Sequence, residues 1–234
     1  FAMIYDILKG KRLRKKGGFM GLSLSQSYFL CALNKKGKIF PRKTETAVCM
    51  TASAVIELML ENVFSCEKKR LKTIGELPEN RGYLGAVYEF VKAKQPVKIE
   101  KVIEHFDLTF SGKHMRAVTD GIGNSLSATG YVSKKKAGLF RNKNVYIPDP
   151  KKAEEAVFPL RAEFLEGGEL TAETVVLAVL LDKCGNLKRY FTSRGRKIIR
   201  KRLKEIKRTP QYEVVQKAVE CTDIFLEWIN LHTK

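Results

Sequence analysis

The chain has 234 residues, 44% of them hydrophobic, which is enough to form the buried core of one domain. It holds 44 Lys and Arg against 25 Asp and Glu, and the formal net charge of +19 exceeds what solubility requires, which indicates a polyanionic partner such as lipid headgroups or nucleic acid. Five widely spaced cysteines without a CxxC pair exclude a disulfide framework and a zinc site, and the longest apolar run, residues 175–181, is too short to span a bilayer. We therefore expect a cytoplasmic protein that contacts membranes only peripherally.

Residues 1–21 are expected to form a basic arm, because six of the eight residues from 9 to 16 are Lys or Arg. From residue 22 to residue 234 the pattern predicts one globular, mostly α-helical domain. Residues 22–33 form a short helix that ends before Gly37, and residues 46–62 form a longer helix with an apolar face. The charged stretch 67–80 is interpreted as a linker, since it contains Gly75 and Pro78.

Three further helices are expected between residues 84 and 128, the first ending at Pro96 and the third capped by Ser111. Their apolar faces consist of Leu84, Val87, Tyr88 and Val91, then Ile99, Val102, Ile103 and Phe106, then Met115, Val118, Ile122 and Leu126.

The pattern changes at residue 131, where short apolar segments flank a basic, turn-rich stretch. Residues 131–147 are predicted to form a protruding β-hairpin, which Pro148 and Pro150 end. Four more helices follow, at residues 153–165, 175–181, 194–208 and 212–231. The second of these is apolar on all sides, which predicts central burial.

Catalytic signatures are absent from the sequence. There is no GxSxG, HExxH, P-loop or GxGxxG motif, and His105, His114 and His232 have no carboxylate or cysteine at a suggestive spacing. We therefore expect no enzyme activity, no metal and no cofactor, and we interpret His105 as a packing or capping residue.

The helix predicted at residues 194–208 is the most informative charged element. Nine of its fifteen residues are Lys or Arg, while Ile199, Leu203 and Ile206 form an apolar stripe. One face is therefore buried and the rest is cationic. At about 1 kcal/mol per basic residue near an anionic bilayer, half of these charges would hold a domain on a membrane. The alternative is a helix that is merely solvated.

Nucleic-acid binding is the alternative function. Three short helices followed by a basic hairpin, over residues 86–147, is the order of elements in a winged helix, with residues 111–129 as the recognition helix. Only Lys113 and Arg116 are fixed cations at the start of that helix, fewer than phosphate contacts normally need.

Several segments in the same order resemble the Golgi phosphoprotein 3 family. They are LSLSQSYFLCALNKKG at residues 22–37, AVIELML at 54–60, YEFVKAKQP at 88–96, MRAV at 115–118 followed by GYV at 130–132, and the apolar helix at 175–181. The resemblance implies a mostly α-helical fold with a protruding β-hairpin. It also implies peripheral binding to membranes that carry phosphatidylinositol 4-phosphate, and an adaptor role.

The resemblance also implies a headgroup site. The family's pocket uses a tryptophan and several arginines, and Arg116 matches one of these arginines. The other arginines fall at Thr119 and near Thr51, and the tryptophan falls near Pro41 or Arg42. We expect the headgroup to contact Arg42, Lys43, Lys113 and Arg116, with Arg116 as an ordinary surface residue being the alternative. These departures favour a bacterial relative with reduced phosphoinositide selectivity.

The hairpin tip is expected to enter the membrane or an interface between copies of the chain. Leu139 and Phe140 lie at the expected turn, far from any core, and Arg141 follows them in a stretch rich in lysine. The alternative is that these two side chains fold back onto the domain or pack against a neighbouring subunit.

Overall fold

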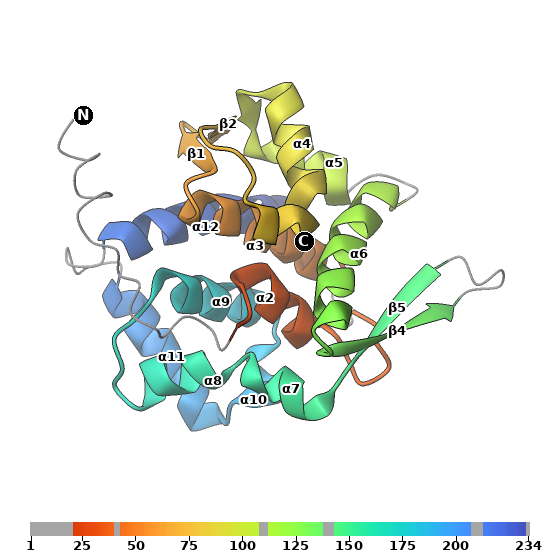
Figure 1. The fold of residues 1–234 in the computed structure, drawn as a ribbon. Helices are drawn as coiled ribbons and strands as arrows, with labels where there is room; N and C mark the ends of the chain where they lie inside the picture. The colour runs from red at the N-terminus through yellow and green to blue at the C-terminus, as the bar shows by residue number, and fades with distance from the viewer. Residues whose placement is uncertain (1–20, 40–42, 108–111, 138–142, 207–212, 233–234) are drawn as a thin grey trace.

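The computed structural model describes residues 21–39, 43–107, 112–137, 143–206 and 213–232, with the side chains of residues 43, 213–218 and 232 left out. Within these ranges the protein is mostly α-helical, with two small antiparallel sheets, and its buried side chains form one core (Figure 1). The predicted fold class is confirmed. No helix in this part of the chain is both long and apolar enough to cross a membrane.

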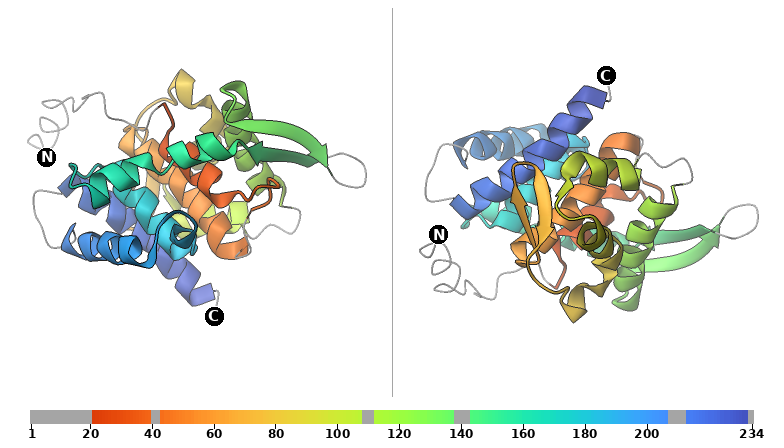
Figure 2. Two further views of the ribbon diagram at one scale, coloured as in Figure 1. Left: turned by 90° about the horizontal axis from the view of Figure 1, so that it is seen from below. Right: turned by 90° about the horizontal axis from the view of Figure 1, so that it is seen from above.

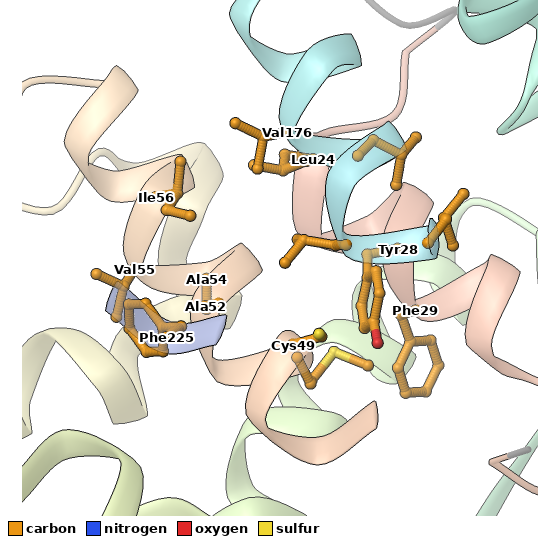
Figure 3. Close-up of a cluster of buried hydrophobic side chains, with 14 of the residues drawn as sticks. Leu24, Tyr28, Phe29, Cys49, Ala52, Ala54, Val55, Ile56, Val176 and Phe225 are labelled. Carbon is orange, nitrogen blue, oxygen red and sulfur yellow. The ribbon is translucent and has the colours of Figure 1, made fainter. Parts of the chain in front are cut away.

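Four helices from distant parts of the sequence form the centre of the fold. They are α2 (Leu24–Ala32), α3 (Lys43–Leu60), α9 (Ala172–Lys183) and α12 (Glu213–His232), which pack against one another (Figure 1). Figure 3 shows side chains of all four helices gathered in one cluster. Residues 175–178 and 180–181 are fully buried, which confirms the expected central position of the apolar helix.

The N-termini of two central helices are fixed by side-chain caps. Ser23 accepts a hydrogen bond from the backbone N–H of Gln26, and the Gln26 side chain accepts one from the backbone N–H of Ser23. This reciprocal capping box starts α2. Thr171 caps α9 in a similar way by accepting a hydrogen bond from the N–H of Thr174.

The prediction that residues 67–80 form a linker is wrong. Strands β1 (Phe64–Glu67) and β2 (Arg70–Thr73) form a tight hairpin, and β2 also pairs with β3 (Val97–Lys98). The two turn residues, Lys68 and Lys69, have φ of 50° and 61°. Such turns usually contain Asn or Gly, so two lysines gave no sequence signal. Leu71, fully buried, anchors the hairpin to the core.

The next group of helices confirms the predicted apolar stripes. After the short helix η1 (Glu79–Leu84) come α4 (Gly85–Lys94), α5 (Ile99–Asp107) and α6 (Lys113–Ala128). Two glycines of α6 permit close packing. A methyl group on Gly123 would lie 2.6 Å from the Tyr146 ring, and one on Gly121 would collide with the backbone carbonyl of Tyr83.

The protruding hairpin is confirmed as strands β4 (Val132–Ala137) and β5 (Lys143–Pro148), which extend away from the helices (Figures 1 and 2). Tyr146 holds its base in place. The Tyr146 ring lies 5.9 Å from that of Phe29, and its hydroxyl donates a hydrogen bond of 2.8 Å to Oδ1 of Asp120 on α6.

The single helix predicted at residues 153–165 is broken into α7 (Pro150–Glu155), α8 (Phe158–Leu160) and the π-turn η2 (Arg161–Leu165). Pro159 explains the break, because it has no N–H to donate to the carbonyl of Glu155 and its ring clashes with that carbonyl in a continuous helix. After α9 come α10 (Leu187–Tyr190) and α11 (Ser193–Ile206), and α11 packs against η2 (Figure 1).

Candidate functional site

The start of α6 carries the predicted cations Lys113 and Arg116. Gly112 is the N-cap residue, with φ of 56°, and none of the described side chains caps this helix. Ser111, the predicted cap, lies outside the described residues. Lys113 and Arg116 are both exposed and lie one helical turn apart. The Arg116 guanidinium forms no ion pair or hydrogen bond with any residue described, and the positive end of the helix dipole adds to these two charges.

The two described histidines lie beside this helix start. The rings of His105 and His114 are 3.9 Å apart between centroids, and His105 stacks on Phe90 at 4.0 Å. Partial burial lowers the pKa of His105, and His114 and Lys94 lower it further. A neutral ring stacked between aromatic neighbours fits the predicted packing role.

Thr51, near which the resemblance implies an arginine, is fully buried on α3. Its hydroxyl donates a hydrogen bond of 3.2 Å to Oδ1 of Asp107, the last residue of α5, whereas Oδ2 of Asp107 accepts none from the part of the chain that is described. Burial raises the pKa of the Asp107 carboxyl to about 8. A threonine and a largely protonated carboxylic acid therefore occupy this position at neutral pH.

Thr119, which matches another family arginine, does not project from α6. Its hydroxyl donates back to the carbonyls of Met115 and Arg116, at 3.0 and 3.2 Å. Among the matched positions that are described, only Arg116 presents a cation to solvent. Four predicted contacts, Arg42, Leu139, Phe140 and Arg141, lie outside the described residues, and Lys43 is described only as the first backbone position of α3.

A second cationic surface lies on α11. The predicted stripe is confirmed, since Ile199 and Ile206 are buried and Leu203 is partly buried against the core. Three arginines of this helix are anchored to the body of the protein, which sequence could not reveal. Arg196 donates to the Phe191 carbonyl at 2.9 Å, Arg200 donates to Oδ1 of Asp182 at 2.7 Å, and Arg202 donates to the Glu163 carbonyl.

The buried carboxylate of Glu57 was not predicted from the sequence. Glu57, 3% exposed, accepts hydrogen bonds on Oε2 from the N–H and the hydroxyl of Ser25, at 2.8 and 2.6 Å. Its Oε1 accepts from the Tyr83 hydroxyl and pairs with Nε of Arg81 at 3.1 Å. Both oxygens are occupied, so Glu57 joins α2, α3 and η1 rather than serving as an acid or base. A single acid in the apolar segment 54–60 was the available signal.

No group of three or more potential metal ligands occurs among the residues described. No curated protein sequence matches this chain. The family model of Golgi phosphoprotein 3 (GPP34), whose family is not one of enzymes, matches residues 24–222, from the first turn of α2 into α12. This match covers most of the 234 residues and includes the α6 cations, their supporting helices and the hairpin. The chain therefore belongs to the Golgi phosphoprotein 3 family.

Proposed function

We propose that this protein is a peripheral membrane-binding protein that recognises anionic phospholipid headgroups, including phosphatidylinositol 4-phosphate, through the start of α6. The observation that carries the proposal is the pair of exposed cations, Lys113 and Arg116, on the first turn of that helix. Family membership and the net charge of +19 support it.

The chemistry of the two cations suits a phosphate monoester. The planar guanidinium of Arg116 donates two parallel hydrogen bonds to phosphate oxygens, whereas Lys113 contributes a point charge. A hydrogen bond to a charged group contributes about 1.5–3 kcal/mol, and the helix dipole at an N-terminus favours anions by about 0.3–1 kcal/mol.

The neighbouring positions favour broad anion recognition over strict selectivity. Thr51 is engaged with Asp107, and Thr119 is bonded to its own helix, so neither supplies a further cation to the headgroup. We therefore propose that phosphatidylinositol 4-phosphate is preferred only moderately over other anionic lipids.

The test is co-sedimentation with phosphatidylcholine vesicles that contain phosphatidylinositol 4-phosphate, phosphatidylserine or neither. Arg116→Ala removes the guanidinium and its two parallel hydrogen bonds, and we expect binding to the phosphoinositide vesicles to fall about tenfold or more. Arg116→Lys keeps the charge and should give an intermediate loss. Lys72→Ala, at an exposed position on β2, is the matched control and should bind as the wild type does.

Two results would contradict the proposal. One is unchanged binding of Arg116→Ala to phosphoinositide vesicles. The other is a duplex DNA that binds more tightly than the vesicles at matched salt, which would favour the nucleic-acid alternative. On the described part of α6 the exposed fixed cations are only Lys113 and Arg116, which favours the lipid.

A further inference from the structure

Exposed apolar side chains gather beside the cationic helix α11. Among the residues described, the large hydrophobic side chains that remain exposed are Ile74, Phe158, Leu165, Ile198 and Leu231. Three of these five belong to α8, η2 and α11, which lie together in Figure 1. Single exposed apolar residues need no explanation, but a group on adjacent elements marks an interaction surface.

Contact geometry places two of these side chains on one surface. A methyl group on Gly195 of α11 would lie 3.8 Å from Cδ1 of Leu165. Ile198 follows Gly195 by three positions, so it lies on the same side of α11, one turn further along. The Leu165 and Ile198 side chains are 38% and 37% exposed, and they therefore present part of their apolar surface to solvent.

Cations flank this apolar surface on the side away from Leu165. Arg194 and Lys201 lie one turn before and one turn after Ile198, and Lys197 directly precedes it. All three are exposed, and only Lys201 has an ion pair with a described residue, at 3.9 Å to Glu205. An exposed pair at that distance contributes little. We name Arg194, Lys197, Ile198, Lys201 and Leu165 the α11 surface.

The net charge of this surface is positive. Residues 193–206 contain seven Lys or Arg and one Glu. Glu166, next to Leu165, is an exposed acid on the η2 side, and it offsets only a small part of this excess. The surface is also held in place, because Arg196, Arg200 and Arg202 attach α11 to the body of the protein through backbone and carboxylate acceptors.

We infer that the α11 surface is a second membrane-docking site, which binds the surface of an anionic phospholipid bilayer without recognising a particular headgroup. An anionic bilayer offers negative charge at its surface and apolar chains just beneath, and this matches cations that flank the partly exposed Ile198 and Leu165. A nucleic acid would match the cations but not the apolar centre.

This inference goes beyond the proposed function because it concerns a different side of the molecule. Helix α6 and the β4–β5 hairpin lie on one side in all the views of Figures 1 and 2, and α11 lies on the other. The two proposed binding sites can therefore be tested independently.

The test uses phosphatidylcholine vesicles with and without phosphatidylserine and lacking any phosphoinositide. Lys197→Glu combined with Lys201→Glu should weaken binding to the phosphatidylserine vesicles more than tenfold, since each basic residue near an anionic surface contributes about fivefold. The matched control reverses two exposed lysines on the three-stranded sheet, Lys72→Glu with Lys98→Glu. It has the same net charge and should lose far less binding.

The apolar part of the inference needs its own variant. Ile198→Ser should weaken phosphatidylserine binding severalfold while the salt dependence of binding stays as in the wild type. Ile198→Trp provides a readout that does not depend on affinity. Its additional indole fluorescence should shift to shorter wavelength on the anionic vesicles and be quenched by brominated lipid chains.

The inference is overturned if the α11 double variant and its control lose binding equally, since net charge alone would then explain the effect. It is also overturned if the Ile198→Trp fluorescence does not respond to the vesicles, or if the double variant loses binding to duplex DNA but keeps binding to lipid. Arg116→Ala reports on the other site, because it should reduce binding to phosphatidylinositol 4-phosphate vesicles more than binding to phosphatidylserine vesicles.

Discussion

Replacing Asp107 by Asn should raise the free energy of unfolding, and this increase should be larger at higher pH. Burial raises the pKa of this carboxyl from 3.8 to about 8. Below pH ~4 the carboxyl is protonated in both the folded and the unfolded states, so its ionisation does not lower the free energy of unfolding. Between pH ~4 and ~8 the unfolded state loses its proton first, and the stability of the wild type falls as pH rises. Above pH ~8 both states are ionised and the loss is complete.

The magnitude follows from the size of the shift. One pKa unit corresponds to about 1.4 kcal/mol, so the full shift corresponds to about 6 kcal/mol. Asp107 is only partly buried as a residue, and solvent reduces this value, so we expect about 2–3 kcal/mol between pH 5 and pH 8. The asparagine oxygen still accepts the hydrogen bond from Thr51. For a domain of this size the gain is about 5–10 °C in melting temperature.

Thermal unfolding followed by circular dichroism at pH 5, 7 and 8 measures this effect in Asp107→Asn and in the wild type. Glu89→Gln, at an exposed position on α4, is the control and should change the melting temperature by the same small amount at every pH. If Asp107→Asn differs from the wild type equally at pH 5 and pH 8, the carboxyl is not titrating between them and the reasoning is refuted.

Three further predictions concern the core, the hairpin base and the hairpin tip. Glu57→Ala removes the shared acceptor of a buried network and should lower the free energy of unfolding in urea by about 3–5 kcal/mol, more than Glu57→Gln does. Gly123→Ala places a methyl group against the Tyr146 ring and should cost about 1–3 kcal/mol, but it should cost much less when it is made in the Tyr146→Ala variant, which lacks the ring. Leu139→Ser with Phe140→Ser should weaken vesicle binding without changing the melting temperature or the sedimentation coefficient. A smaller particle would instead indicate that the tip joins copies of the chain.

The helices that sequence predicted correctly are those whose apolar residues recur at helical spacing. Helices α3, α5 and α6 all appear at the expected places, because a stripe of buried residues dominates their stability. The β4–β5 hairpin was predictable for the same kind of reason, since its apolar segments flank a turn-rich stretch. Local pattern and tertiary structure agree in these elements.

Elements that depend on tertiary contacts were not predictable in this way. The β1–β2 hairpin turns at Lys68 and Lys69, residues that rarely adopt positive φ, and only the burial of Leu71 reveals why the turn forms there. Pro159 is visible in the sequence, but the predicted helix at residues 153–165 took no account of it. At the candidate site, the exposure of Arg116 follows from how α6 packs, whereas the engagement of Thr51 with Asp107 depends on two distant helices.

The cations of α11 show why a count of charges cannot locate a binding surface. Its arginines and lysines look equivalent in the sequence, yet three of the four arginines are attached to the body of the protein and the lysines are exposed. The difference follows from side-chain chemistry, because a guanidinium fork donates to fixed carbonyl and carboxylate acceptors, whereas an ammonium on a flexible stem stays hydrated. The arginines thus orient the helix and the lysines set the charge of its outer face. Replacing the anchored arginines should therefore affect stability as well as binding, and the exposed lysines are the positions at which binding can be tested alone.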